Sequence, residues 1–288
     1  MHVIRMEARA AQAEALDAFF EEREESDLTA WVDWEAQTVR YEIYVGDAAA
    51  VAARVSDVNA ALAAAGHGEV VAVASELPDC DWQDAWKSFF HWERVSPRLA
   101  VTPPWETPDV SADVSVIRID PGMSFGTGRH PTTRACLRWL DALATKRAAG
   151  AGFCDLGCGS GILAIGAAML GYRPVVAMDH DPVAVEYAAR NLAVNGIEGA
   201  DVCEADVETW DDPRTFYVVA ANMVSRRLAL YAEQVTRRVA MEPGAALILA
   251  GAMTDQYAEV AAAYEAQGLR ELERCEDPPW VSAVFVRS

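Results

Sequence analysis

The chain has 288 residues with 24 Lys or Arg against 44 Asp or Glu, which gives a formal net charge of −20. Hydrophobic residues make up 52% and no Gly-, Pro- or Gln-rich tract dominates, so the composition excludes an intrinsically disordered chain and predicts one large or two unequal folded domains. Because the acidic excess repels phosphate backbones, we expect no direct nucleic-acid binding and favour a positively charged protein partner.

The cysteines and the apolar runs bear on the cellular compartment. The six cysteines show neither a C-x-x-C pair nor a zinc-ligand spacing, which predicts free thiols in a reducing compartment and no metal site. The N-terminus is charged by Arg5 and is no signal peptide, and the longest apolar run, near 245–253, is far shorter than the roughly 20 residues that a membrane helix needs. We therefore expect a cytoplasmic protein without a membrane partner.

The first 75 residues alternate between strand and helix patterns. Asp47 is a plausible N-cap of the second helix and Gly66 a plausible stop. The order strand–helix–strand–strand–helix–strand predicts a small α+β ferredoxin-like domain over residues 1–75. Its expected elements are a strand at 3–8, a helix at 11–23, strands at 28–34 and 38–45, a helix at 47–66 and a strand at 70–74.

Residues 76–110 differ in composition, because tryptophan and proline recur through them. A helix is possible at 81–92, and the rest is extended and interrupted by proline. We interpret this stretch as a connector whose aromatic side chains pack as anchors, and a strand at 114–119 follows it.

The remaining sequence, residues 111–288, predicts a doubly wound, seven-stranded Rossmann-like α/β domain, because strands and helices alternate in it. The chain closes with a predicted hairpin of strands at about 269–275 and 281–287. Before it, strands are expected at 153–156, 175–178, 200–203, 215–220 and 246–250, and helices at 160–170, 182–195, 225–240 and 255–267.

The motif DLGCGSG, residues 155–161, follows the first of these strands and opens a helix. Its glycines, Gly157, Gly159 and Gly161, let the backbone turn tightly and approach a ligand, and the helix N-terminus offers free N–H groups to a carboxylate or a ribose. Asp179, at the end of the next strand, can accept hydrogen bonds from both ribose hydroxyls.

Two cofactors fit this pattern. The run GSGILA, residues 159–164, satisfies the dinucleotide fingerprint G-x-G-x-x-A. However, Asp155 lies just before the loop, where a carboxylate would repel a pyrophosphate but could hold the cationic amino group of S-adenosylmethionine. The spacing therefore favours S-adenosylmethionine over NAD.

A second motif, DPGMSFGTGRHPTT, occupies residues 120–133. Its density of Gly, Pro and Thr predicts a shaped loop rather than a regular element, and Thr132 or Thr133 is a candidate cap for a helix at 133–143.

The two motifs together resemble the ribosomal protein L11 methyltransferase (PrmA) family. The family's hallmark is D-P-G-x-x-F-G-T-G-T-H-P-T-T followed by D-x-G-C-G-S-G-I-L-A-I; this chain has Arg129 where the family usually has Thr. Further matches are Asp81-Trp82, Trp86-Lys87, DHDP at 179–182, Asn191, Asn195-Gly196 and Ala221-Asn222.

The resemblance implies an S-adenosylmethionine-dependent protein N-methyltransferase that modifies lysine and/or N-terminal amines of a ribosomal protein. It also implies that the N-terminal domain recognises the substrate. Cofactor contacts are implied at Thr133, Gly157, Asp179 and Asn222, and at Asp206 near the adenine amino group.

For catalysis we expect Asn222 to orient the amine, with His130 either accepting a proton or fixing its loop through hydrogen bonds. The acidic surface would steer a basic substrate. The family usually has a proline soon after the Asn222 motif, whereas this chain has Arg226 and Arg227 there; with Arg129, these arginines bear on which protein is methylated.

Other functions remain open on the sequence. One is a methyltransferase of the same fold that acts on another basic protein or a small amine, and another is a non-catalytic S-adenosylmethionine-binding module. The intact Asn222 and glycine loop argue against the second.

Overall fold

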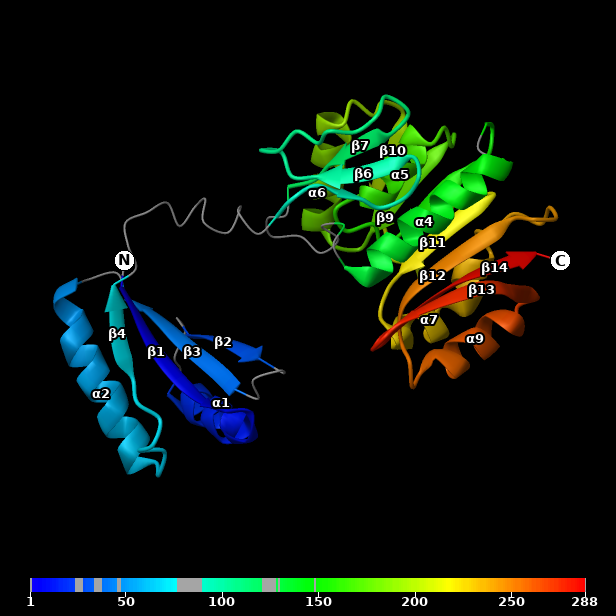
Figure 1. Cartoon of the computed structure of the whole chain (residues 1–288). Helices are drawn as coiled ribbons and strands as arrows, with labels where there is room; N and C mark the ends of the chain where they lie inside the picture. The colour runs from blue at the N-terminus through cyan, green and yellow to red at the C-terminus, as the bar shows by residue number, and fades with distance from the viewer. Residues whose placement is uncertain are drawn as a thin grey trace. The chain divides into compact units, whose positions relative to one another are not determined.

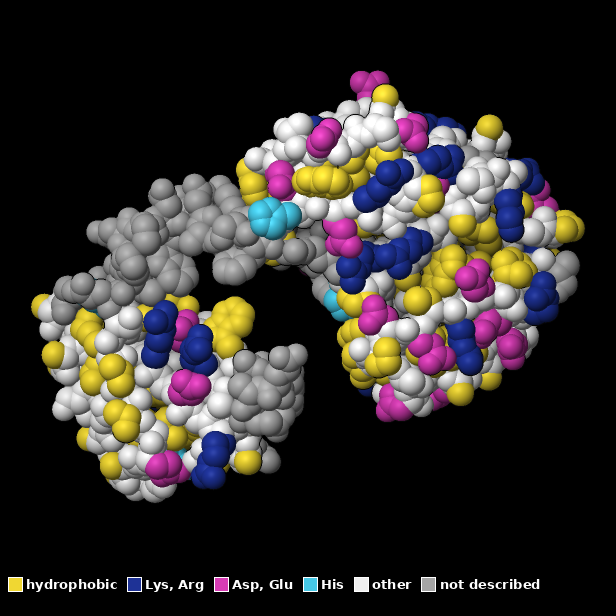
Figure 2. All heavy atoms as spheres, viewed as in Figure 1, with side chains coloured by type: hydrophobic (Ala, Val, Ile, Leu, Met, Phe, Trp, Pro, Cys, Tyr) yellow, Lys and Arg dark blue, Asp and Glu magenta, His cyan; other side chains and the backbone are white. Residues whose placement is uncertain are grey.

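The computed structural model describes residues 2–23, 28–33, 38–45, 48–76, 90–120, 128, 130–147 and 149–287. The chain divides into two compact units, Met1–Phe89 and Phe90–Ser288 (Figure 1). On the face that Figure 2 shows, charged side chains of both signs lie interspersed over the described residues of each unit. No helix in these described ranges is long and apolar enough to cross a membrane.

The first unit is a four-stranded antiparallel sheet with two helices, and the predicted βαββαβ order is confirmed. The strands lie in the order β2-β3-β1-β4. The elements are β1 (His2–Arg9), a 3-10 turn and α1 (Ala13–Glu22), β2 (Leu28–Asp33), β3 (Thr38–Val45), α2 (Val51–Ala64) and β4 (Val73–Glu76).

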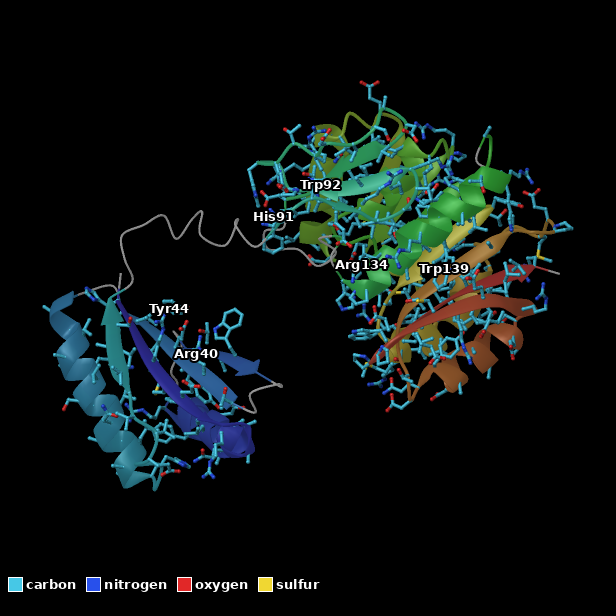
Figure 3. The ribbon with its side chains drawn as sticks, in the orientation of Figure 1. Arg40, Tyr44, His91, Trp92, Arg134 and Trp139 are labelled. Atoms are coloured by element: carbon cyan, nitrogen blue, oxygen red, sulfur yellow. The ribbon has the colours of Figure 1, made fainter. Side chains whose placement is uncertain are left out.

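The alternation along β3 shows why this sheet has one packed face. Val39, Tyr41 and Ile43 are buried in a core shared with β1 and both helices, as the period-two pattern requires. Arg40 and Tyr44 project from the other face (Figure 3). The predicted stop at Gly66 is confirmed, since that residue has φ +87° just after α2, and Asp47 lies outside the described residues.

The second unit is built on a seven-stranded, mostly parallel sheet, as predicted. The order is β10-β9-β8-β11-β12-β14-β13; the first five strands run parallel, and the predicted terminal hairpin adds two antiparallel strands. The strands are β8 (Phe153–Leu156), β9 (Val175–Asp179), β10 (Ala200–Glu204), β11 (Val218–Asn222), β12 (Ala246–Met253), β13 (Leu269–Asp277) and β14 (Trp280–Arg287).

Helices cover both faces of this sheet, so successive strand residues enter two different cores. On β11, Val218 and Ala220 pack on one side, and Val219 and Ala221 on the other. The first side carries α4 (Pro131–Lys146), α5 (Ile162–Met169) and α6 (Pro182–Val194); the second carries α7 (Ser225–Leu230), α8 (Ala232–Thr236) and α9 (Tyr257–Glu265).

Residues 90–120 add a three-stranded sheet to the second unit. It consists of β5 (Glu93–Arg94), β6 (Leu99–Thr102) and β7 (Ser115–Arg118) in that order, with β6 and β7 parallel. The strand expected at 114–119 is confirmed as β7, whereas β5 and β6 were not predicted. Most of the helix expected at 81–92 lies outside the described residues.

Two local predictions were wrong. Neither Thr132 nor Thr133 caps α4, because Pro131 occupies the first helical turn and His130 is the N-cap residue, without a side-chain cap bond. The single helix expected at 225–240 is two short helices, and beyond them the backbone of Arg238 and Ala240 pairs with Phe216 instead of continuing a helix.

Candidate functional site

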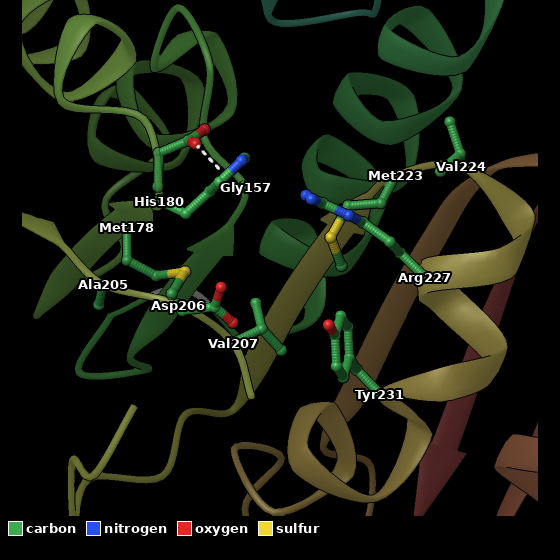
Figure 4. Close-up of a pocket in the computed structure, with 11 residues that line it drawn as sticks. Gly157, Met178, His180, Ala205, Asp206, Val207, Met223, Val224, Arg227 and Tyr231 are labelled. Carbon is green, nitrogen blue, oxygen red and sulfur yellow. Dashed lines mark hydrogen bonds and ion pairs between the residues drawn. The ribbon is translucent and has the colours of Figure 1, made fainter. Parts of the chain in front are cut away.

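The strand order reverses between β8 and β11, and such a switch point opens a crevice at the carboxyl ends of the strands. Asp179 and Asn222 are the last residues of β9 and β11, and Gly157 directly follows β8. A pocket of about 330 Å³ lies beside these ends (Figure 4). It is lined by Gly157, Met178, Asp179, His180, Ala205, Asp206, Val207, Met223, Val224, Arg227 and Tyr231.

Asp179 holds the backbone around the pocket with both carboxylate oxygens. One oxygen accepts the Gly159 N–H at 2.9 Å, and the other accepts the Asp181 N–H at 3.1 Å and lies 3.1 Å from the His180 Nδ1. The residue is almost entirely buried, at 7% exposed. These bonds fix the carboxylate at the rim of the crevice and tie the glycine loop to the next strand.

The glycine loop uses most of its N–H groups for hydrogen bonds inside the protein. The Gly157 and Cys158 amides both donate to the Met178 carbonyl, at 2.9 and 3.0 Å, and Gly161 donates to the Cys158 carbonyl at 2.8 Å. Gly159 donates to Asp179, so three of these four amides bond to β9 and one bonds within the loop. The predicted free N–H groups belong to the N-terminus of α5, which begins at Ile162, and these loop bonds do not test that prediction.

The glycines give the loop its shape. Gly157 and Gly161 have φ values of +72° and +75°, which disfavour residues with a Cβ. A Cβ on Gly161 would lie 3.0 Å from the Ala188 Cβ, so this glycine lets α6 approach α5 closely. Gly157 leaves the pocket floor without a side chain.

Asp155 lies behind the loop, at 1% exposed, and does not line the pocket. It accepts a bond from the Ala164 N–H, while its Oδ2 has no hydrogen-bond partner among the described residues. Burial, together with the nearby charge of Asp179, raises the pKa of this carboxyl to about 7. A buried acid with an unpaired oxygen is suited to receive a cationic group.

The two candidate catalytic residues lie near the start of α4. The Asn222 Nδ2 donates to the Thr133 Oγ1 at 3.5 Å, which ties the end of β11 to the first turn of α4. The His130 Nδ1 lies 2.7 Å from the Thr132 Oγ1, and its ring packs edge-on against Trp280 with centroids 5.2 Å apart. Burial and then Arg134 lower the pKa of His130, which favours the neutral ring.

Asp206 lines the pocket from the turn after β10. Its Oδ1 accepts the Glu208 N–H at 2.8 Å, which orients the carboxylate. Thr133, Asp155, Asn222 and His130 do not line the 330 Å³ pocket, whereas Asp179, Asp206 and Gly157 do. Arg129 lies outside the described residues.

Comparison with known proteins shows which family the chain belongs to. The family model described as ribosomal protein L11 methyltransferase (PrmA) matches residues 4–288. The chain belongs to this family. It is 36% identical over 235 residues to the ribosomal protein L11 methyltransferase of Chloroflexus aurantiacus, which covers 73% of this chain and 70% of that protein.

Two further similarities agree with the family. The ribosomal protein L11 methyltransferase of Pelobacter propionicus is 38% identical over 219 residues, covering 75% of this chain and 70% of that protein. Among solved structures, the ribosomal protein L11 methylase of Lactobacillus delbrueckii subsp. bulgaricus matches with a TM-score of 0.61 at 28% identity, covering 69% of this chain and all of that chain.

A methyltransferase of this family uses S-adenosylmethionine as its methyl donor, and the residues present suit that cofactor. Asp179 and Asp206 offer hydrogen-bond acceptors at the pocket, and the unpaired oxygen of Asp155 suits an ammonium group. A carboxylate at Asp155, just before the glycine loop, would repel the pyrophosphate of NAD. The pocket volume lies within the range of small-molecule sites.

Several residues of this site were not found from the sequence. Gly251 has φ +92°, and a Cβ there would run into the Met223 carbonyl oxygen. Its position in β12, beside a register shift, is the usual sign of a close backbone approach, so a glycine inside an apolar strand was the available signal. Met223 and Tyr231 enter the pocket from the chain after β11, and no motif marks them.

Proposed function

We propose that the chain methylates amino groups of ribosomal protein L11, at lysine side chains and/or the N-terminal amine, in the cytoplasm. The names of its relatives support the substrate. The observation that carries the chemistry is Asn222, held by Thr133 at the end of β11 and followed directly by pocket residue Met223.

The proposed cofactor contacts divide by chemistry. Asp179 receives the ribose hydroxyls, Asp206 the adenine amino group, and Asp155 the ammonium group of the methionine portion. The other contacts are Thr133, Gly157, Gly159, Gly161 and Asn222. When bound, the cofactor supplies a methyl group on a positively charged sulfur.

The acceptor amine must arrive neutral. A lysine with a pKa of about 10.4 lies roughly three units above cytoplasmic pH, so deprotonating it costs about 4 kcal/mol, and an N-terminal amine near 8 costs much less. Because the Asn222 Nδ2 donates to Thr133, its Oδ1 is left to accept an N–H of the neutral amine and aim the lone pair.

His130 is the second candidate for a role in the reaction. Its lowered pKa favours the neutral ring, which is able to accept a proton, while its contacts with Thr132 and Trp280 also suit a positioning role. Replacement by Gln separates the two roles, because Gln keeps a hydrogen-bonding side chain without a titrating ring.

The chain's parts receive the following roles. Residues 1–75 form a ferredoxin-like substrate-recognition domain, which the βαββαβ order and the antiparallel sheet support. Residues 76–110 connect it to the methyltransferase domain, 111–288, and the end of the connector pairs through β6 with β7 of the second unit.

The test is transfer of a labelled methyl group from S-adenosylmethionine to purified ribosomal protein L11. We expect label on L11, loss of label when its amines are acetylated beforehand, and at least a hundredfold slower transfer in Asn222→Ala at saturating cofactor. If the protein bound the cofactor but labelled only another basic protein or a small amine, L11 would be refuted as the substrate. Binding without transfer to any acceptor would leave a non-catalytic binding module.

A further inference from the structure

Two adjacent arginines, Arg226 and Arg227, point to different pockets. Arg227 lines the 330 Å³ pocket, whereas Arg226 lines a second pocket of about 580 Å³ formed by α7 and α9. Figure 4 shows the Arg227 side chain reaching from α7 into the first pocket beside Met223, with Asp206 and Met178 on the opposite side.

The guanidinium group of Arg227 is available to a ligand. Within the described part of the chain, its side chain makes no hydrogen bond and no ion pair, and the residue is exposed. Arg227 and Asp206 line the same pocket, yet no ion pair within 4.0 Å joins them. The two opposite charges therefore line one pocket without pairing with each other.

The pocket corresponds to one end of the proposed cofactor site. Asp179 and Asp206, assigned to the ribose and the adenine amino group, both line it. Thr133, Asn222 and Asp155, assigned to the methionine portion and the reacting end, do not. On these assignments the pocket receives the adenosine half of the cofactor.

The walls of the pocket suit a flat aromatic ring. Met178, Ala205 and Val207 give one apolar side, and Met223 and Val224 give another. Arg227 and Tyr231 are four residues apart around α7 and its end, a spacing that puts both side chains on one side of the helix. A guanidinium plane stacks on an aromatic base and attracts its π face.

We propose that Arg227 is a specificity residue for the cofactor, whose guanidinium group packs on the adenine ring and holds it against the apolar wall, with Asp206 accepting from the ring's amino group. This inference rests on the proposed cofactor site. It gives a role to one of the two arginines that depart from the family pattern, and it assigns the other, Arg226, to a different surface.

The test is isothermal titration of the purified full-length protein with two probes. Adenosylhomocysteine carries the whole cofactor skeleton, and methylthioadenosine carries the adenine and ribose without the amino-acid portion. The variants are Arg227→Met, which keeps an unbranched apolar stem, and Arg227→Lys, which keeps the charge but not the plane. Arg226→Met is the matched control on the same helix.

We expect Arg227→Met to lower the affinity for both probes by the same factor, about tenfold, as for the loss of a stacked guanidinium. Arg227→Lys should restore little of this, and Arg226→Met should bind both probes like the wild type. Circular dichroism and thermal unfolding of each variant would show that the fold is retained.

Three results would overturn the inference. If Arg227→Met bound adenosylhomocysteine more weakly but methylthioadenosine with unchanged affinity, Arg227 would contact the cofactor carboxylate instead. Full rescue by Lys would make the interaction one of charge alone, and unchanged binding in Arg227→Met would remove the contact. If the wild type bound neither probe, the proposed cofactor site itself would fail, which is a distinct outcome.

Discussion

Replacing Asp155 with Asn tests whether a buried acid beneath the glycine loop destabilises the protein when it ionises. Asn has nearly the same shape and can still accept the Ala164 N–H, but it carries no charge at any pH. In the wild type, burial raises the pKa of Asp155 from 3.8 to about 7.

The raised pKa of Asp155 determines the sign and the size of its effect on the free energy of unfolding. Since the folded-state pKa lies above the unfolded one, the contribution of Asp155 to stability is full below about pH 4 and is lost as pH rises through about 7. Within that window, each pH unit removes about 1.4 kcal/mol of the free energy of unfolding. Between pH 5.5 and 7 the wild type should therefore lose about 2 kcal/mol relative to Asp155→Asn.

Urea denaturation of both proteins at several pH values between 5.5 and 8 measures this difference directly. The exposed Asp211, replaced in the same way, is the control and should leave the pH dependence of the wild type unchanged. A difference between wild type and Asp155→Asn that stays constant across this range would refute the reasoning, because the acid would then titrate as it does in water.

Three further outcomes follow from the site. Gly251→Ala should lower the melting temperature by about 4–8 °C, since its Cβ would meet the Met223 carbonyl at a positive φ; an unchanged melting temperature would contradict the close approach. Thr133→Val should slow labelled-methyl transfer about tenfold by releasing Asn222, while Thr133→Ser should not; equal rates in both would exclude this hydrogen bond from positioning. Asp179→Ala should abolish adenosylhomocysteine binding in calorimetry and Asp179→Asn should weaken it less, because one amide oxygen still accepts an N–H; wild-type affinity in the Ala variant would remove Asp179 from the site.

Sequence patterns predicted the fold of both units because apolar and polar residues alternate along strands of the first, whereas short, continuously apolar strands alternate with helices in the second. The strand at 153–156 has the predicted bounds, whereas the strand predicted at 215–220 spans 218–222 and so ends at Asn222. Where tertiary pairing competes with local pattern, prediction failed. Residues 225–240 carry no glycine or proline, so nothing local shows that Arg238 and Ala240 pair with Phe216 rather than extend a helix.

The site was predictable in its residues more than in its bonding. The glycine pattern locates the loop, but it does not show that Gly157, Cys158 and Gly161 donate their amides within the protein. Nor does spacing separate Arg227 from Arg226, since the direction of each side chain depends on how α7 packs against α9 and the sheet. Such details are set by contacts between segments far apart in sequence.

The carboxyl-terminal hairpin has a consequence for solubility. β12 is buried along nearly its whole length, and its sequence, ALILAGAM, is apolar throughout. β14 pairs with the side of β12 that would otherwise be a free edge, and the new edge, β13, exposes Arg270, Glu273, Arg274 and Glu276. Charged edge strands discourage strand-to-strand aggregation. The hairpin therefore replaces an apolar, aggregation-prone edge strand with a charged one.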